Sequence, residues 1–534
     1  MRVQRLYGLF CLAMMLPGCA GSADIIEDPP TDTGTEPTTF YGVSEITVTE
    51  MSFNQGIGAV VWRDGVSVPA SSREVPLIAG RDGVIRLMWS APASFESREV
   101  EARVTLVSGQ EQEEFSGRGW VTAGVANRDF LDQTLNVSVP GTAIRGDTVV
   151  TVDLFEVEGR EGVEASSAVA AVPLGAWEEP MALKVTLFSC AMECGVPTLS
   201  TSDAQRRGTE HMLMNVFPVN ALALDWRAET LVLDGCSSVE ALEGLQEKRA
   251  NEGASADTYY HCIFPQAYDS FMSGGFGWVL SDELAEPRVS LSVNWWGPGE
   301  EMLTNVAHEL GHNHGRLHPW NDDNWSPTSA KSTGCRTSWG LGIRSGPYPT
   351  EYWYPELSDP TALVMPPAAD PGACEYVENS SSPPPTGDVM SYTFPQWVDP
   401  YTYRAFAERI RVLNTFADSE QDTAWKSGRT LFAAFSPEGV RWTWGMGRLG
   451  AEDQPTAGQR ATLRLANGRI FTVPVRPRVD GEGVIRGFSV PLPPSARAAG
   501  LTEAGQWAGM LKVQFHGREV HLDVASLRME DGAL

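Results

Sequence analysis

Residues 308–318 read His-Glu-Leu-Gly-His-Asn-His-Gly-Arg-Leu-His and fit the pattern H-E-x-x-H-x-x-G-x-x-H at every fixed position. On a helix, His308 and His312 lie about one turn apart on the same face. Two neutral imidazoles at that spacing can bind one Zn²⁺. Glu309 lies beside them, so it is the candidate general base that takes a proton from a metal-bound water.

The second half of the stretch supplies a third ligand. Gly315 can adopt a positive φ and end the helix, which lets the chain turn back and bring His318 to the metal. Three protein ligands leave a fourth position open, which is the catalytic arrangement of zinc. His314 stands at a variable position and is rotated by about 200° from His312, so we do not expect it to be a fourth ligand.

This extended pattern is the metzincin signature, and the chain resembles that family of zinc endopeptidases. The segment 308–313 (H-E-L-G-H-N) is most similar to the reprolysin branch, although Pro319 stands where that branch usually has Asp. The resemblance implies an α+β catalytic domain in which a strand runs into the zinc helix. It also implies one catalytic Zn²⁺ on His308, His312 and His318.

Residues 387–392 (G-D-V-M-S-Y) resemble the Met-turn that lies beneath the metal in metzincins. The M-S-Y form is similar to the serralysin and astacin branches. By this resemblance Met390 is a hydrophobic base to the site and not a ligand. Tyr392 is a candidate zinc ligand or transition-state stabiliser. The gap between His318 and Met390 is long for the family and indicates an insertion.

Local patterns predict the elements around the site. Residues 288–295 alternate apolar and polar side chains and predict a strand, and Glu300 and Glu301 favour a helix N-terminus. Four apolar residues share the core-facing side of this helix, namely Met302, Leu303, Val306 and Leu310. The histidine face is expected to line a cleft, with the glycine-rich residues 274–277 as a turn near it. Asp399 and Pro400 predict the start of a closing helix.

The N-terminus predicts export. Arg2 and Arg5 precede an apolar run, and residues 16–19 (L-P-G-C) resemble a lipobox with Cys19 as the lipidated residue. An ordinary secretory signal is the alternative. Ala20 after the cysteine favours the outer membrane by resemblance to enterobacterial sorting. We therefore expect a protein anchored to the membrane by lipid, at the outer membrane or cell surface of a Gram-negative bacterium.

Eight cysteines are present, and six are left once Cys11 and Cys19 are set aside as signal and lipidation residues. An even number in an oxidising compartment predicts three disulfides. Local order suggests 190–194, 236–262 and 335–374, although the sequence does not fix connectivity; half of a metal site at 190–194 is an alternative. The net charge of −28 argues against nucleic acid or an anionic membrane surface as a partner.

Composition and punctuation predict a multidomain chain. We expect a signal peptide at 1–18, a flexible tether at 19–40, and an immunoglobulin-like β-sandwich at 41–178 that is a spacer, a substrate-binding module or both. A metzincin-like zinc protease domain at 179–428 and a C-terminal β domain at 429–534 follow. Residues 321–324 (N-D-D-N) are either a weak calcium site or a solvated loop. The remaining histidines are interpreted as structural, namely His211, His261, His516 and His521.

The sequence thus predicts a zinc-dependent endopeptidase that hydrolyses extracellular proteins or glycoproteins, with Glu309 as general base. One alternative is a surface lipoprotein whose β modules bind a partner and whose zinc site does not catalyse. An intact Glu309 argues against it, since a structural site needs no base there. The other alternative is a zinc amidase or related hydrolase acting on cell-wall material. No pattern in the sequence indicates specificity or oligomeric state.

Overall fold

The computed structural model describes residues 41–43, 45–127, 133–157, 167–194, 203–265, 274–280, 288–294, 300–318, 342–344, 352–353, 363–364, 387–390, 396–417, 430–436, 439–445, 460–464, 470–474, 476–481, 483–491, 510–515 and 518–523. The expected signal peptide, tether and lipidated Cys19 lie outside these residues, as do Tyr392, Cys335, Cys374 and residues 321–324. The protein is mostly β, with several separate sheets and few helices. None of the helices in the described ranges is long and apolar enough to cross a membrane.

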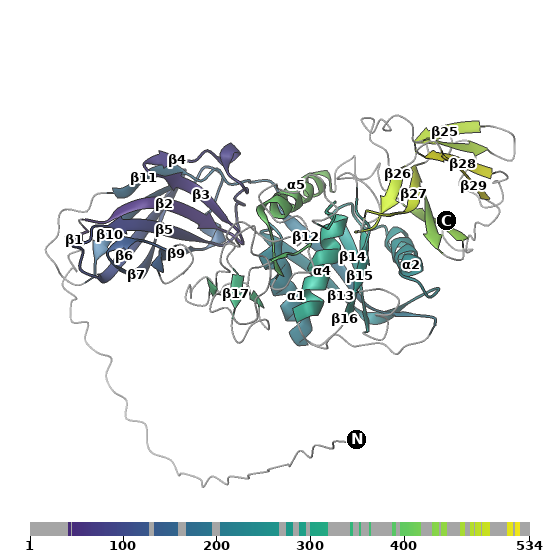
Figure 1. Cartoon of the computed structure of the whole chain (residues 1–534), viewed down its shortest axis with the longest axis horizontal. Helices are drawn as coiled ribbons and strands as arrows, with labels where there is room; N and C mark the ends of the chain where they lie inside the picture. Colours follow the sequence, from purple (N-terminus) through teal and green to yellow (C-terminus); the bar gives the residue numbers. More distant parts are fainter. Residues whose placement is uncertain are drawn as a thin grey trace, which may run out of the picture. The chain divides into compact units, whose positions relative to one another are not determined.

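Residues up to 173 form a five-stranded and a six-stranded antiparallel sheet (Figure 1). The first has the order β1-β10-β6-β7 with β11 beside β10, and the second β4-β3-β2-β5-β8 with β9 beside β5. Strand β10 alternates partly exposed and buried residues, so Val150, Val152 and Leu154 point into a core. The strands are β1 Tyr41–Gly42, β2 Thr47–Asn54, β3 Gly58–Arg63, β4 Val66–Ser67, β5 Gly83–Ala91, β6 Arg98–Ser108, β7 Glu111–Val121, β8 Gly124–Val125, β9 Leu135–Val139, β10 Val149–Glu156 and β11 Ser167–Pro173.

A third sheet packs against the helix that carries two of the metal-ligand candidates, and it has the order β13-β12-β14-β16-β15. Its first four strands are parallel, and β15 closes the row antiparallel to β16. The strands are β12 Ala182–Met192, β13 Ala221–Leu233, β14 Thr258–Pro265, β15 Gly275–Gly277 and β16 Val289–Asn294. Central parallel strands are buried on both faces, and β14 accordingly has no exposed residue.

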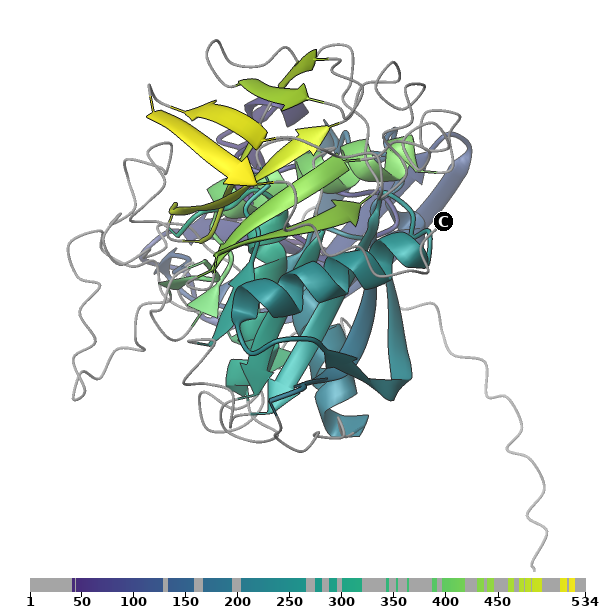
Figure 2. The same cartoon turned by 90° about the vertical axis from the view of Figure 1, so that its right-hand side faces the viewer.

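Helices pack on both faces of this sheet. Leu187 and Tyr259 share a core with residues of α1 (Asp203–Val216), α4 (Glu300–Asn313) and α5 (Pro400–Phe416). Phe188 and Tyr260, one position further along their strands, share a separate core with α2 (Ser238–Asn251). In Figure 2 the teal helix α2 crosses in front of the strands that it covers. The two-residue period of the strands therefore sorts side chains between the two layers.

The helix boundaries follow local capping chemistry. Helix α4 begins at Glu300, as the paired glutamates predict. Asp399 is the N-cap of α5 and accepts a hydrogen bond from the Tyr401 backbone N–H at 2.8 Å, with Pro400 in the first turn. Ser237 and Glu240 form a reciprocal capping box on α2, so its first backbone N–H groups are satisfied.

The remaining described residues form smaller sheets. Two four-stranded sheets lie beyond residue 429, with the orders β23-β22-β27-β26 and β25-β24-β28-β29. Their strands are β22 Thr430–Ser436, β23 Gly439–Gly445, β24 Arg460–Arg464, β25 Ile470–Pro474, β26 Arg476–Val479, β27 Ile485–Pro491, β28 Met510–Phe515 and β29 Arg518–Asp523. A three-stranded sheet joins β17 Gly342–Arg344, β18 Tyr352–Trp353 and β19 Leu363–Val364, and β20 Gly387–Asp388 pairs in parallel with β21 Gln396–Trp397.

The disulfides differ from the pairing by local order. Cys190 bonds to Cys262 and Cys194 bonds to Cys236, with Cα–Cα distances of 5.6 and 5.8 Å. Cys190 lies on β12 and Cys262 on the adjacent strand β14, so sheet pairing brings them together. Residues four apart on an extended chain are about 13 Å apart, too far for a disulfide. Both 190–194 and 236–262 were therefore wrong as pairs, and neither Cys190 nor Cys194 is a metal ligand.

Candidate metal centre

The end of α4 delivers the third histidine as the sequence predicts. Gly315 has φ of +82°. Its N–H donates to the His312 carbonyl at 2.9 Å, and the Arg316 N–H donates to the Gly311 carbonyl at 3.1 Å. These bonds close the last turn of the helix while the positive φ reverses the chain. His318 consequently lies beside the two histidines of the helix instead of continuing along its axis.

His308, His312 and His318 form one buried group. Each offers a ring nitrogen, and these three atoms lie within 4.8 Å of one another. His308 Nε2 and His318 Nε2 are 3.1 Å apart. Zinc–imidazole bonds of about 2.0–2.1 Å in a tetrahedral site place neighbouring nitrogens about 3.4 Å apart. The group is therefore of the size and chemistry to hold a metal ion.

Backbone carbonyls orient two of the three imidazoles. His308 Nδ1 donates to the Val389 carbonyl at 2.7 Å, and His312 Nδ1 donates to the Arg316 carbonyl at 2.6 Å. A carbonyl can only accept, so the proton of each ring lies on Nδ1. The Nε2 lone pairs are then directed into the histidine group, which is the tautomer that a metal requires.

Burial also fixes the charge state of the ligands. Removal from water, together with the smaller effect of a neighbouring imidazole, lowers the pKa of His308 and of His312 to about 3. The same two causes lower the pKa of His318 to about 2. All three rings are thus neutral across the physiological range, as metal binding demands, and no proton needs to be displaced.

Glu309 is buried beside the histidines but does not belong to their ligand group. Its Oε2 has no hydrogen-bond partner among the described residues, and burial raises the pKa of the carboxyl well above its usual value. A methyl group on Gly275 would overlap Glu309 Oε1, so β15 passes directly against the carboxylate. Residues 275–277 thus form an edge strand, and their prediction as a turn was wrong, although they do lie near the site.

Met390 lies beneath the helix, buried at 0% exposure. A methyl group on Gly311 would overlap Met390 Sδ, so the glycine inside the histidine motif leaves the space for this side chain. Asp388 Oδ1 accepts from the Met390 N–H and Oδ2 from the Asp399 N–H, each at 2.7 Å. Gly311 and Asp388 were not assigned a role from sequence, because their roles depend on which segment packs beneath the helix.

Two other buried histidines are used by the fold. His314 contacts the Leu310 carbonyl at 2.8 Å and the Tyr259 hydroxyl at 3.2 Å. His261 contacts Ser290 Oγ at 2.8 Å and Ser292 Oγ at 2.9 Å. Both nitrogens of each ring are therefore occupied, which agrees with the structural interpretation of both residues.

The histidine group does not open onto a cleft within the described part of the chain. His308, His312 and His318 are 5%, 2% and 3% exposed. Gly481, at the turn between β26 and β27, lies against His312 and His318, and the His318 N–H donates to its carbonyl at 3.3 Å. Gly481, more than 160 residues away in sequence, therefore covers ring edges on the face that was expected to line a cleft.

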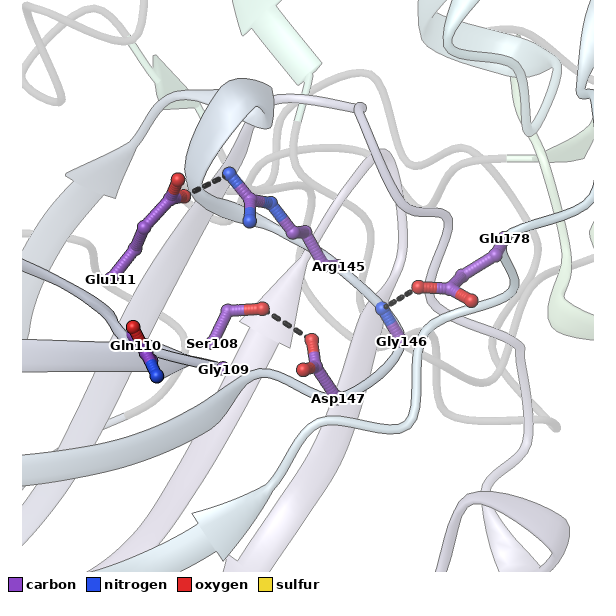
Figure 3. A pocket seen from close by; sticks show the side chains of 8 residues that line it. All are labelled: Ser108, Gly109, Gln110, Glu111, Arg145, Gly146, Asp147 and Glu178. Carbon is purple, nitrogen blue, oxygen red and sulfur yellow. Dashed lines mark hydrogen bonds and ion pairs between the residues drawn. The ribbon is translucent and has the colours of Figure 1, made fainter.

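A pocket lies elsewhere, at the end of the β6–β7 hairpin (Figure 3). Its acidic residues are already engaged: Glu111 pairs with Arg145, Asp147 accepts from Ser108, and Glu178 accepts from the Gly146 N–H. None of the predicted site residues lines it.

No family model matches the chain, and a search of curated proteins finds no match. The site must therefore be interpreted from its own residues.

Proposed function

We propose that this protein is a zinc-dependent endopeptidase. The observation that carries the proposal is the position of Glu309, a buried carboxylate beside three neutral histidines. Its Oε2 has no hydrogen-bond partner in the described residues. A buried carboxyl without such a partner costs stability, so a fold that needed only a structural metal would have no reason to keep it. A proton-transfer role next to the metal accounts for its position.

Zinc bound by His308, His312 and His318 would lower the pKa of a bound water toward neutrality and polarise a carbonyl. Glu309 would serve as the general base for a water held there and would pass the proton to the leaving amine. Burial raises the pKa of the Glu309 carboxyl, which makes it a stronger proton acceptor than an exposed carboxylate. The carbonyls of Val389 and Arg316 hold the rings of His308 and His312 in place. Tyr392, by the family resemblance, would stabilise the oxyanion.

The proposed substrates are extracellular proteins or glycoproteins. The two disulfides suggest an extracytoplasmic protein, since such bonds persist in oxidising compartments. Lipidation of Cys19 would anchor the mature chain to a membrane and so place the site outside the cytoplasm. Labelling with a fatty-acid probe tests the anchor. We expect label in the wild type and none in Cys19→Ser.

The deciding experiment compares wild type with Glu309→Ala on a panel of extracellular proteins and glycoproteins, with new termini identified by mass spectrometry. The variant should keep one zinc per chain and lose about 10²–10⁴ in rate, because it lacks the base but no ligand. His312→Ala is the matched ligand variant and should lose tight zinc binding, since two ligands do not hold the metal with comparable affinity.

Each outcome of this comparison assigns a role to the histidine site. Cleavage by wild type that is lost in Glu309→Ala establishes the endopeptidase. Binding of a glycoprotein without cleavage, equal in both proteins, would establish the binding module instead. Equal cleavage by both would remove Glu309 from the mechanism, and a wild type that takes up no zinc on reconstitution would remove the metal.

A further inference from the structure

The turn between β26 and β27 covers the metal-facing side of the histidine group. A methyl group on Gly481 would overlap His312 Nε2 and lie 3.0 Å from His318 Cε1. These atoms form the ring edges that face a bound metal. The His318 N–H also donates to the Gly481 carbonyl at 3.3 Å. The turn therefore occupies the space next to the ligand nitrogens themselves.

A polypeptide substrate needs that space. Its scissile carbonyl must reach the open position of the metal and the water that Glu309 activates. The three histidines and Glu309 are each at most 6% exposed, and Gly481 lies against the ring edges of His312 and His318, so a scissile carbonyl cannot approach from this side while the turn is in place. Substrate binding requires the turn to move away.

Local hydrogen bonds hold the turn together. Asp480 Oδ1 accepts from the Val484 N–H at 2.9 Å, and Asp480 Oδ2 pairs with Arg486 at 2.7 Å. Backbone bonds join Asp480 to Val484 and to Gly483, whose φ is +71°. Both carboxylate oxygens of Asp480 serve the turn itself, and Asp480 is not in the metal-ligand group. The cover is thus a preformed hairpin end held by its own bonds.

Polar contacts of described residues attach this hairpin next to the site. The Val279 N–H donates to the Val479 carbonyl at 3.0 Å as an isolated antiparallel bridge. Arg478 pairs with Glu243 of α2 at 2.6 Å, with both side chains buried, and stacks on Trp278 at 3.9 Å. Trp278 and Val279 directly follow β15, which lies against Glu309. The attachment points therefore adjoin the site.

We propose that the β26–β27 turn is an autoinhibitory cap on the metal centre, which lifts to admit a polypeptide. The proposal rests on the proposed function, since it names the regulation of the same site. The closed position is the one that the structure describes, held by the 279–479 bridge and by Arg478. Displacement of the hairpin uncovers His312 and His318 without altering the histidine ligands.

A reversible lock tests the cap in the full chain. Antiparallel partners lie about 4.5–5.5 Å apart at Cα, which suits a disulfide, so Val279→Cys with Val479→Cys should close the bridge covalently. The readout is the association rate of a fluorescent hydroxamate, which chelates zinc, with the zinc-loaded protein. Oxidation should slow association at least about tenfold, because the lock removes the open population. Each single cysteine variant, given the same oxidant and reductant, is the control and should not respond.

Gly481→Ala should make hydroxamate association faster, whereas the disulfide should make it slower. The added methyl group overlaps His312, so the turn is displaced and hydroxamate association should become faster while one zinc is retained. Val484→Ala, on the exposed side of the same turn, is the matched control and should behave as wild type.

Equal association rates in the oxidised and reduced double variant would overturn the cap, and so would failure of the disulfide to form. Protein hydrolysis measured on the same samples separates the two proposals. If the disulfide slows hydroxamate association but the protein cleaves no substrate, the cap proposal is supported and the endopeptidase proposal is contradicted. If cleavage depends on Glu309 but is the same in the oxidised and reduced double variant, the endopeptidase proposal is supported and the cap proposal is contradicted.

Discussion

Arg81 and Arg478 attach β regions to the part of the chain around the central parallel sheet, and they do so with different partners. Arg81 is 1% exposed and donates to the carbonyls of Met214, Phe217 and Val219 at 2.5–2.7 Å, at the C-terminal end of α1. Arg478 pairs instead with one carboxylate, that of Glu243. Terminal helix carbonyls lack partners within the helix, so Arg81 completes α1, whereas Arg478 only joins two formed elements.

The surrounding cores reinforce the contrast. One hydrophobic cluster runs from Val48 of β2 to Leu413 of α5, so the N-terminal sheets share a core with the helices around the metal group. The Tyr403 hydroxyl adds a 2.9 Å bond to the Gln55 carbonyl. Near Gly481 the described contacts are mainly polar, namely the Arg478–Glu243 ion pair, an Arg478–Gln246 hydrogen bond and the isolated 279–479 bridge. The N-terminal contact is thus part of the fold, and the C-terminal one is suited to opening.

Arg81→Met should produce the largest loss of stability. It leaves several buried carbonyls without their donor, and hydrogen bonds to a charged group contribute about 1.5–3 kcal/mol each. We expect the free energy of unfolding to fall by about 3–5 kcal/mol, measured by urea titration. Arg118→Met is the control, because the Arg118 side chain is exposed and Arg103 still pairs with Glu101 when it is removed. A loss no greater than the control's would erase the difference between the two attachments.

Arg478→Met should destabilise the protein by about 3 kcal/mol, because Glu243 is left charged and buried. The double variant Arg478→Met/Glu243→Gln should recover most of that loss, since a buried pair replaced by neutral residues is nearly neutral in energy. Urea titration of the four proteins of this cycle measures the coupling. No recovery in the double variant would mean that Arg478, like Arg81, is integral to the fold.

The Cys190–Cys262 disulfide ties the central strands on which both attachments depend. Replacing both residues by serine should lower the free energy of unfolding by about 2–4 kcal/mol, since the disulfide restrains the unfolded chain. Thermal unfolding monitored by circular dichroism measures the change. Cys194→Ser/Cys236→Ser is the matched variant for the shorter loop, and it should lose somewhat less.

The smallest expected effect concerns pH on the α5 side. Burial, together with the smaller effect of the charge of Asp399, raises the pKa of Asp388 to about 7. A carboxyl whose pKa is higher folded than unfolded stabilises the protein at low pH, and this contribution disappears as the pH rises through about 7. The free energy of unfolding should fall by about 2 kcal/mol between pH 5.5 and 8. Asp388→Asn should lack this slope, although it is less stable throughout, and an equal slope would assign the titration elsewhere.

Local chemistry made several elements predictable. Gly315 ends α4 because its positive φ reverses the chain. Asp399 caps α5, with Pro400 in the first turn of that helix. Strand β7 was missed, since its polar residues 111–114 show no apolar alternation. It forms because β6 pairs with it from Arg98 to Ser108, a partner that no local pattern reveals.

The sequence by itself determined the ligand set, since the spacing of His308, His312 and Gly315 is read within one helix and the turn after it. It also determined that Glu309 stands next to the histidine group. Only the tertiary structure decided the disulfide partners, the glycine strand against Glu309 and the position of Gly481 over His312. The reason is physical: helix periodicity and backbone conformation act over a few residues, whereas sheet pairing and burial join segments that the chain order separates.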